Sequence, residues 1–266
     1  MQTNKAIRKN AAEKLFTNGN LYVMSLGMCL CVAVAVAPVM LFAVISSLAY
    51  NLPSSISPLL DLAAIFLLLV IFVFVTVPVI GSFFEVCYRL YCGYQTHVAE
   101  VLAPFTMGRR YFAKLRIYLS FLLRLLSPLL VLLAAFFITR LAEIILADFV
   151  ILLFFVRPAI VLIEAAAFVT AVFFNASIFF APYLMCRGYT PRMAVVTSRR
   201  LTSGRLGKVW KYMLGFSGLL VLSVFTVGML FVVYVAPLMI FAYFIYAEQM
   251  INNSHNNIER GNENEG

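Results

Sequence analysis

Long apolar segments alternate with short, polar and mostly basic segments along the whole chain. The apolar stretches run approximately over 21–50, 58–84, 117–186 and 212–246, and only a few charges interrupt the third stretch. Because a membrane-spanning helix needs about 20 apolar residues, the two longest stretches have room for hairpins. The pattern therefore predicts an all-α, polytopic transmembrane bundle of about six spans.

Positive charge is concentrated in the connections between these stretches. The clearest example is the segment 187–211, which contains no acidic residue. Its basic residues are Arg187, Arg192, Arg199, Arg200, Arg205, Lys208 and Lys211. Such a segment is typical of a cytoplasmic loop in a multispan membrane protein, and this orientation predicts that both termini are cytoplasmic.

The remaining connections fit the same orientation. Residues 51–58 contain two prolines and neither Lys nor Arg, which indicates a short outer turn. Residues 92–116 form a second basic inner loop. Residues 1–20 are predicted to form an amphipathic helix on the inner membrane surface, and the polar segment 252–266 is predicted to be disordered. Residues 21–251 then form the membrane domain.

Two apolar stretches allow more than one path. Charges interrupt 139–158, so we expect one full span at 159–186, preceded by an outer interfacial helix at 141–156. The alternative is a two-span hairpin, which would place Arg140 inside. The last stretch, 212–246, is long enough for two spans joined by a tight outer turn near 228–234.

A possible internal repeat divides the membrane domain into halves at 21–140 and 141–251. Gly93-Tyr94 is followed by Gly108-Arg109, and Gly188-Tyr189 is followed by Gly204-Arg205. A chance similarity explains the spacing equally well. Parallel repeats of this kind occur in transporters and also in scaffolds.

Composition excludes an ordinary soluble domain, because 64% of the residues are hydrophobic and 12% are charged, against about 25% charged in soluble domains. The net charge of +9 lies beside the predicted spans, so we expect anionic lipid head groups, and not nucleic acid, as its partners. The five cysteines and two histidines show no metal-ligand spacing. We expect no metal, no cofactor and no enzyme activity, because no catalytic motif is present.

Polar residues within the apolar stretches are the candidates for an intramembrane site. They are Arg124, Glu164 and Asn175. A charge at the bilayer centre costs roughly 2.5–3.5 kcal/mol, so each needs a partner or a route to water. Either Arg124 points inward and Glu164 is paired near the outer face, or both line a polar cavity. Glu85, Asp61 and Glu248 fall near span ends, where a charge costs little.

The inner segment 189–204 is the best-formed local unit. Thr190 can cap a helix with Pro191 in its first turn, and Gly204 suits the helix end. We expect an amphipathic inner elbow helix that docks a partner or rests on lipid. The candidate contacts are Arg192, Arg199, Arg200, Arg205, Lys208 and Lys211.

Three segments resemble a family of bacterial multispan membrane proteins known as domain of unknown function 975. They are Ile7–Leu15 through Gly19-Asn20, Ala194 through Ser198-Arg199 to Ser203-Gly204, and Val227-Gly228 followed by Val235-Ala236-Pro237 and Tyr243–Tyr246. Leu238 departs from the family, which tends to have Tyr after the proline, and 175–183 lacks an expected Pro-Gly. The resemblance implies a six-helix fold in the bacterial cytoplasmic membrane and implies no activity.

Two functions follow from these observations. The first is an accessory or envelope-homeostasis protein that acts through membrane lipids, a membrane protein partner or a second copy of itself. The alternative is a secondary transporter or channel with a polar cavity near Arg124 and Glu164.

Overall fold

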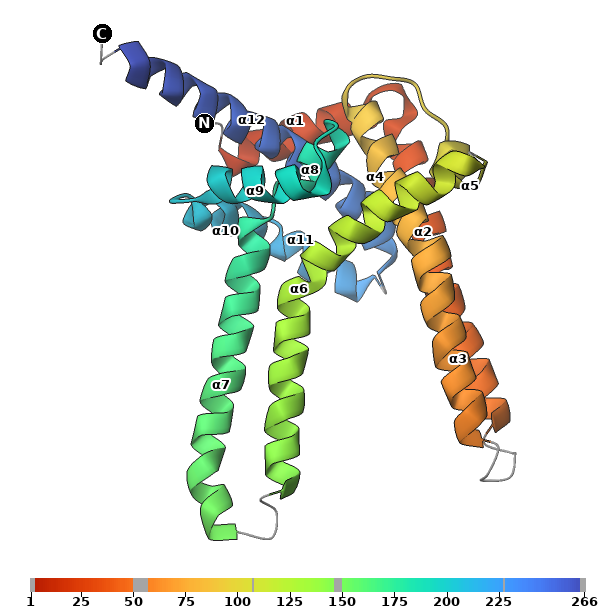
Figure 1. Cartoon of the computed structure of the whole chain (residues 1–266). Helices are drawn as coiled ribbons and strands as arrows, with labels where there is room; N and C mark the ends of the chain where they lie inside the picture. Colours follow the sequence, from red (N-terminus) through yellow and green to blue (C-terminus); the bar gives the residue numbers. More distant parts are fainter. Residues whose placement is uncertain (1–2, 50–56, 107, 146–149, 227, 264–266) are drawn as a thin grey trace.

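Two helical hairpins project from a common platform of shorter helices (Figure 1). The computed structural model describes residues 3–49, 57–106, 108–145, 150–226 and 228–263, and no strand occurs among them. We use the word platform for α1, α8, α9, α10 and the C-terminal half of α12. Both described ends of the chain, Thr3 and Glu263, lie at the platform (Figure 1). The chain is therefore an all-helical protein whose hairpins point away from both of its ends.

The first half of the chain contributes α1 and the first hairpin. In chain order these elements are α1 (Asn4–Phe16), η1 (Thr17–Gly19), α2 (Asn20–Ala49), α3 (Ser57–Ile71), the π-helical η2 (Phe72–Thr76) and α4 (Val77–Tyr91). Helix α1 packs on α12 through Ile7, Ala11 and Leu15, which share one helical face and are buried. The predicted N-terminal amphipathic helix thus rests on the protein, along α12.

The second hairpin follows a short connection, and the platform helices come after it. The elements are η3 (Val98–Leu102), α5 (Ala103–Thr106), α6 (Arg109–Ile145), α7 (Val150–Ser177), α8 (Ala181–Cys186), α9 (Pro191–Thr202), α10 (Leu206–Leu214), α11 (Ser217–Phe225), the π-helical η4 (Phe231–Val235) and α12 (Ala236–Glu263). Helices α6 and α7 pack along each other as the second hairpin.

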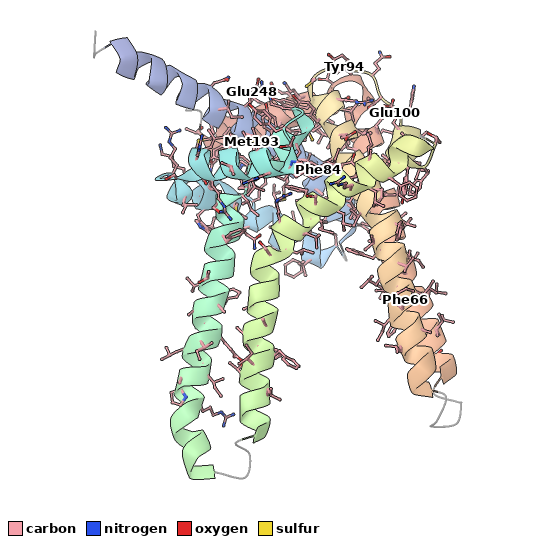
Figure 2. The ribbon with its side chains drawn as sticks, viewed as in Figure 1. Phe66, Phe84, Tyr94, Glu100, Met193 and Glu248 are labelled. Carbon is pink, nitrogen blue, oxygen red and sulfur yellow. The ribbon has the colours of Figure 1, made fainter. Side chains whose placement is uncertain are left out.

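Within the part of the chain that the structure describes, five helical segments are long and apolar enough to cross a membrane, which supports the prediction of a transmembrane protein. They are Asn20–Ser47, Leu62–Tyr91, Arg157–Cys186, Leu206–Phe225 and Phe231–Asn253. Apolar side chains such as Phe66, which is 68% exposed, project outward from the first hairpin (Figure 2). The count of six spans, which adds α6 to these five, stays a prediction.

The structure corrects the expectation of an outer interfacial helix at 141–156. Helix α6 continues through residues 141–145, α7 begins at Val150, and 146–149 lie outside the described residues. Both helices extend because each covers part of the other's apolar surface, and because Thr139 and Glu164 form a hydrogen bond between them. Arg140 lies at the end of the hairpin that is remote from the platform; that this end is the outer one stays a prediction.

The C-terminal polar segment also differs from its expected disorder, because α12 continues to Glu263. Residues 264–266 lie outside the described residues. Extending an existing helix avoids the unfavourable nucleation step, so polar residues can follow a well-packed helix without a break.

The last apolar stretch reverses direction at Gly228, where the backbone has a left-handed φ of 77°. This glycine lies at the start of the predicted turn region. The incoming segment is broken, however, because α10 and α11 are separated at Gly215 and Phe216. Helix α11 has nine residues and a length of about 13 Å, less than half of a bilayer core of about 30 Å.

At four of the prolines within the helices, a side-chain hydroxyl replaces the missing backbone donor. A proline has no N–H for the carbonyl four residues earlier, and in a bilayer core that carbonyl needs another donor. For Pro38 the Thr76 hydroxyl donates to the Val34 carbonyl (3.4 Å), and for Pro78 the Tyr111 hydroxyl donates to the Phe74 carbonyl. For Pro128 the Ser127 hydroxyl donates to the Arg124 carbonyl (2.8 Å), and for Pro237 the Ser25 hydroxyl donates to the Val233 carbonyl (2.6 Å).

The break between α7 and α8 is completed by α9. The Phe180 N–H donates to Ser198 Oγ (3.0 Å), and Ser198 Oγ donates to the carbonyl of Ser177 (3.1 Å). Thr202 Oγ1 also lies 3.0 Å from that carbonyl. Because Phe180, Ser198 and Thr202 are buried, these bonds fix α9 against the end of α7.

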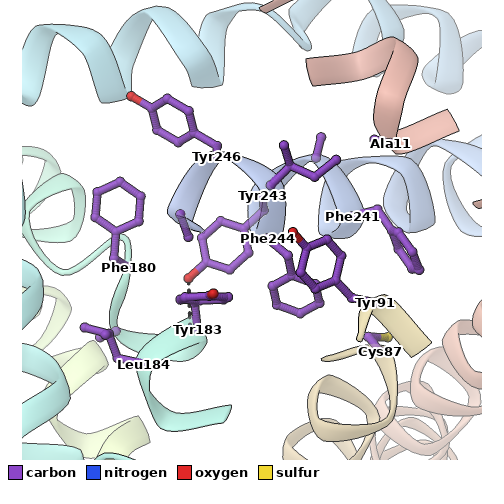
Figure 3. Packing of buried hydrophobic residues seen from close by; sticks show 14 of the residues in the cluster. Ala11, Cys87, Tyr91, Phe180, Tyr183, Leu184, Phe241, Tyr243, Phe244 and Tyr246 are labelled. Carbon is purple, nitrogen blue, oxygen red and sulfur yellow. Dashed lines mark hydrogen bonds between the residues drawn. The ribbon is translucent and has the colours of Figure 1, made fainter. Parts of the chain in front are cut away.

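An aromatic core joins α4, α8 and α12 (Figure 3). Tyr243 is its polar centre, because its hydroxyl donates to the carbonyl of Phe179 (2.9 Å) and accepts from the Tyr183 N–H (3.1 Å). Tyr212 and Tyr246 stack with a centroid distance of 4.3 Å. Tyr243 thus supplies hydrogen-bond partners for two more backbone groups at the break between α7 and α8, the Phe179 carbonyl and the Tyr183 N–H.

Helices α4 and α8 end in the same way, with a glycine in the left-handed conformation. Gly93 and Gly188 have φ values of 89° and 90°. The N–H groups of Tyr94 and Tyr189 each bond the carbonyl five residues earlier, and those of the glycines bond the carbonyl three residues earlier. This is the Schellman helix end, in which a left-handed residue, usually glycine, closes the last turn.

Replacing Ser198 tests the role of α9 in completing the helix break. We expect Ser198→Ala to lower the free energy of unfolding by about 1–3 kcal/mol, because the buried Phe180 N–H loses its acceptor. Denaturant unfolding in detergent micelles measures this loss. The control is Ser223→Ala, since the buried Ser223 hydroxyl donates to the Leu220 carbonyl of its own helix. Equal losses in both variants would contradict the assignment.

Candidate functional site

Three arginines surround one cavity between α6, α7 and α9, which we name the arginine pocket. Its volume is about 260 Å³. The lining residues are Arg124, Ser127, Phe174, Arg192, Val195, Val196 and Arg199. No acidic residue lines it, and no salt bridge to these arginines occurs within the described part of the chain. The cavity is therefore lined by positive charge.

Arg124 enters the pocket from the apolar part of α6. Its Nη1 donates to Ser120 Oγ (2.6 Å) and lies 3.2 Å from the Ser120 carbonyl, one turn closer to the platform. A long basic side chain that bends toward the helix end keeps its charge near the interface. Arg124 thus points toward the N-terminal end of α6; that this direction is inward stays a prediction.

Arg192 and Arg199 enter the pocket from α9. The Thr190 hydroxyl caps this helix at the Met193 N–H (3.4 Å), and Pro191 occupies its first turn, as the sequence predicts. Residues seven apart lie on one face after two helical turns, which brings both arginines to the same side. The Arg199 guanidinium lies 4.4 Å from the centre of the Phe174 ring, a cation–π contact.

The structure does not bring Arg124 and Glu164 together. Glu164 Oε1 accepts from Thr139 Oγ1 (2.8 Å) in the part of the hairpin that is remote from the platform. Thr139 follows Arg124 by fifteen residues on the same helix, which corresponds to about 22 Å. Asn175 lies at the opposite end of α7, beside Phe174 of the arginine pocket.

The other predicted basic contacts lie on the platform outside the pocket. Arg200 is exposed on α9, Lys208 and Lys211 are exposed on α10, and Arg205 is half-buried just before α10. Helix α1 is tied to this region, because Asn4 Nδ2 donates to the Lys211 carbonyl (3.0 Å) and Arg8 donates to the Gly215 carbonyl (3.0 Å). Of the six candidates, only Arg192 and Arg199 line the arginine pocket.

A second cavity, which we name the apolar groove, lies between α4, α6 and α8. Its volume is about 360 Å³. The lining residues are Phe72, Val77, Ile80, Gly81, Phe84, Glu85, Ile117, Tyr118, Phe121, Leu122, Pro182, Met185, Cys186, Gly188 and Tyr189. Glu85 is the one charged residue among them, so the groove combines an apolar wall with a single carboxylate.

Two residues of α6 hold the Glu85 carboxylate. Lys114 Nζ lies 2.8 Å from Oε2, and the Tyr118 hydroxyl donates to Oε1. Gly81 permits this arrangement, because a Cβ at this position would lie 2.7 Å from the Tyr118 ring. The charge of Glu85 is thus balanced by Lys114 beside the groove, in contrast to the unpaired lining of the arginine pocket.

Sequence reasoning assigned no function to Glu85, and it did not connect Glu85 with Lys114 or Tyr118. A signal is nevertheless present. Gly81 and Glu85 are four residues apart, as are Lys114 and Tyr118, so each pair shares a helical face. Gly81 leaves room for the Tyr118 ring, and the Glu85 carboxylate has a charge opposite to that of Lys114, so the two faces are complementary.

No protein-family model, curated protein or solved structure matches this chain. The resemblance to domain of unknown function 975 therefore stays a prediction. Among the described residues, no group of three His, Cys, Asp or Glu side chains is placed to hold a metal ion.

Substituting Gly81 tests the close approach of Tyr118. Alanine in place of a helical glycine usually stabilises a helix by up to about 1 kcal/mol. Here the added Cβ collides with the Tyr118 ring, so we expect Gly81→Ala to destabilise the protein by about 1–3 kcal/mol in thermal unfolding. The matched control is Gly218→Ala in α11, where nothing lies within 4 Å of the new Cβ. A neutral Gly81→Ala variant would contradict this packing.

Proposed function

We propose that this chain is a protein of the bacterial cytoplasmic membrane that binds anionic lipid head groups at the inner face through the arginine pocket. Through this contact it acts in envelope homeostasis or as an accessory subunit. The observation that carries the proposal is the meeting of Arg124, Arg192 and Arg199 around one cavity. A lipid phosphate suits this cavity, because guanidinium groups donate paired hydrogen bonds to phosphate oxygens.

The distribution of charge supports an inner location for the platform. Of the 20 lysines and arginines, only Arg140 and Arg157 belong to the ends of α6 and α7 that are remote from the platform. An excess of Lys and Arg on one side of the spans marks the cytoplasmic side. Each such charge near an anionic leaflet contributes about 1 kcal/mol of attraction.

Lipid recognition is favoured over the transporter alternative. A transport pathway based on Arg124 and Glu164 requires both in one cavity, and their separation along the hairpin, about 22 Å, does not provide it. The arginine pocket instead lies where α6 and α7 meet the platform, at the depth of lipid head groups. A protein partner or a second copy of the chain can use Arg200, Lys208 and Lys211, which lie outside this pocket.

Neutralising the pocket tests the proposal. We expect the double variant Arg192→Gln and Arg199→Gln to weaken binding of phosphatidylglycerol by tenfold or more, because each lost charged hydrogen bond contributes about 1.5–3 kcal/mol. Native mass spectrometry with mixed phosphatidylglycerol and phosphatidylcholine measures the ratio of bound lipids.

The matched control is Arg200→Gln, which removes the same charge from a position on the same helix that does not line the pocket. The single variants Arg199→Gln and Arg200→Gln each remove one positive charge, so they differ only in whether the lost arginine lines the pocket. An equal loss of phosphatidylglycerol in both single variants would mean that diffuse surface charge, and not the pocket, attracts the lipid.

The orientation has its own test. We expect green fluorescent protein fused after the C-terminus to fluoresce in bacterial cells, because it folds in the cytoplasm. Alkaline phosphatase fused at the same point is expected to be inactive, since it needs the oxidising outer compartment. An active phosphatase fusion with a dark fluorescent fusion would place the platform outside.

A further inference from the structure

The apolar groove runs along the first hairpin over a length similar to one membrane leaflet. On that hairpin its wall extends from Phe72 in η2 to Glu85 in α4, a distance of about 20 Å along the helix. Half of a bilayer core of about 30 Å is about 15 Å. The opposite walls come from α6 and from α8 with the turn that follows it. The groove is therefore long enough for an extended alkyl chain.

The groove opens on the membrane side of the protein. Phe72, Ile80 and Ile117 line it and are 41%, 42% and 44% exposed. These residues belong to helices whose outer surfaces are apolar, so the surroundings of the opening are lipid. A lipid chain can enter sideways between α4 and α6 without passing through water. Its volume of about 360 Å³ falls within the usual range of small-molecule sites, about 300–1,000 Å³.

At its polar end the groove is lined by Glu85, and Lys114, which lies beside the groove and forms an ion pair with Glu85, adds the opposite sign of charge. Glu85 and Lys114 are half-buried, with 34% and 27% of their side chains exposed. A carboxylate accepts about four hydrogen bonds, and an ammonium group donates three. The pair therefore offers an acceptor to a ligand amine and a donor to a ligand phosphate. This pattern is complementary to a zwitterionic head group, whereas the arginine pocket is complementary to an anion.

We propose that the apolar groove binds a zwitterionic, amine-bearing phospholipid, with one acyl chain along α4 and the head group at Glu85 and Lys114. The phosphate accepts from Lys114, the primary amine donates to Glu85, and Tyr118 orients the carboxylate. This site is separate from the arginine pocket and takes a different class of lipid. The two sites together distinguish head groups by charge.

Photo-crosslinking in lipid nanodiscs tests the occupant. The probe is phosphatidylethanolamine with a diazirine in one acyl chain, and crosslinked peptides are mapped by mass spectrometry. We expect crosslinks in residues 72–85 and 117–122. Filling the groove with Cys186→Trp is expected to reduce these crosslinks at least tenfold. Leu69→Trp on α3 is the control, since this side chain is 56% exposed and does not line the groove.

A second variant covers the case in which Cys186→Trp does not fold. Ile80→Trp adds the same bulk at the opening, where the native side chain is 42% exposed. Crosslinks that persist in both filled variants would overturn the proposal, as would equal crosslinking by probes with ethanolamine, choline and glycerol head groups. The double variant Glu85→Gln and Lys114→Met is expected to abolish the preference for ethanolamine while crosslinking of the chain persists.

The outcome is independent of the arginine pocket. Arg199→Gln is expected to leave phosphatidylethanolamine crosslinks in the groove unchanged while it lowers phosphatidylglycerol binding. Loss of the groove crosslinks in Arg199→Gln would show that the two cavities form a single site, and would overturn the separate site proposed here.

Discussion

The structure depends on one constraint, which is that every backbone polar group within a bilayer must have a hydrogen-bond partner inside the protein. Prolines and the break between α7 and α8 leave several groups without their helical partners. Hydroxyl groups from other parts of the fold supply most of the replacements. Ser25 joins α2 to η4, Thr76 joins η2 to α2, and Tyr111 joins α6 to η2. The bonds that complete one helix therefore also determine which helix lies beside it.

The same constraint builds the arginine pocket. Ser198 and Thr202 attach α9 to the end of α7, because they complete the backbone at Ser177 and Phe180. Arg199 is adjacent to Ser198 in sequence, so this attachment also brings its guanidinium over Phe174. The charge that makes the pocket is thus positioned by bonds whose first role is structural.

Local features of the fold could be predicted from the sequence, and long-range features could not. Thr190 and Gly228 mark a helix start and a chain reversal through their own conformational preferences. The region 141–156 was misjudged because its scattered charges suit an interface as well as the end of a long hairpin. Arg124 and Arg199 are 75 residues apart, so no local pattern reveals that they share a pocket. Glu85 was passed over because a span-end charge is inexpensive whether or not it faces a partner.

Helix α6 shows how one element can give two cavities opposite electrostatic character. Lys114 and Arg124 are both basic and lie within three turns of each other on this helix. Lys114 faces Glu85 of α4, so its charge is balanced and the groove beside it favours a ligand that is neutral overall. Arg124 faces Arg192 and Arg199 of α9, so its charge is reinforced and the pocket favours an anion. The difference in ligand preference comes from the neighbouring helix and not from α6 itself. A basic side chain on α6 favours a neutral ligand where an acidic residue faces it and an anionic ligand where other basic residues face it.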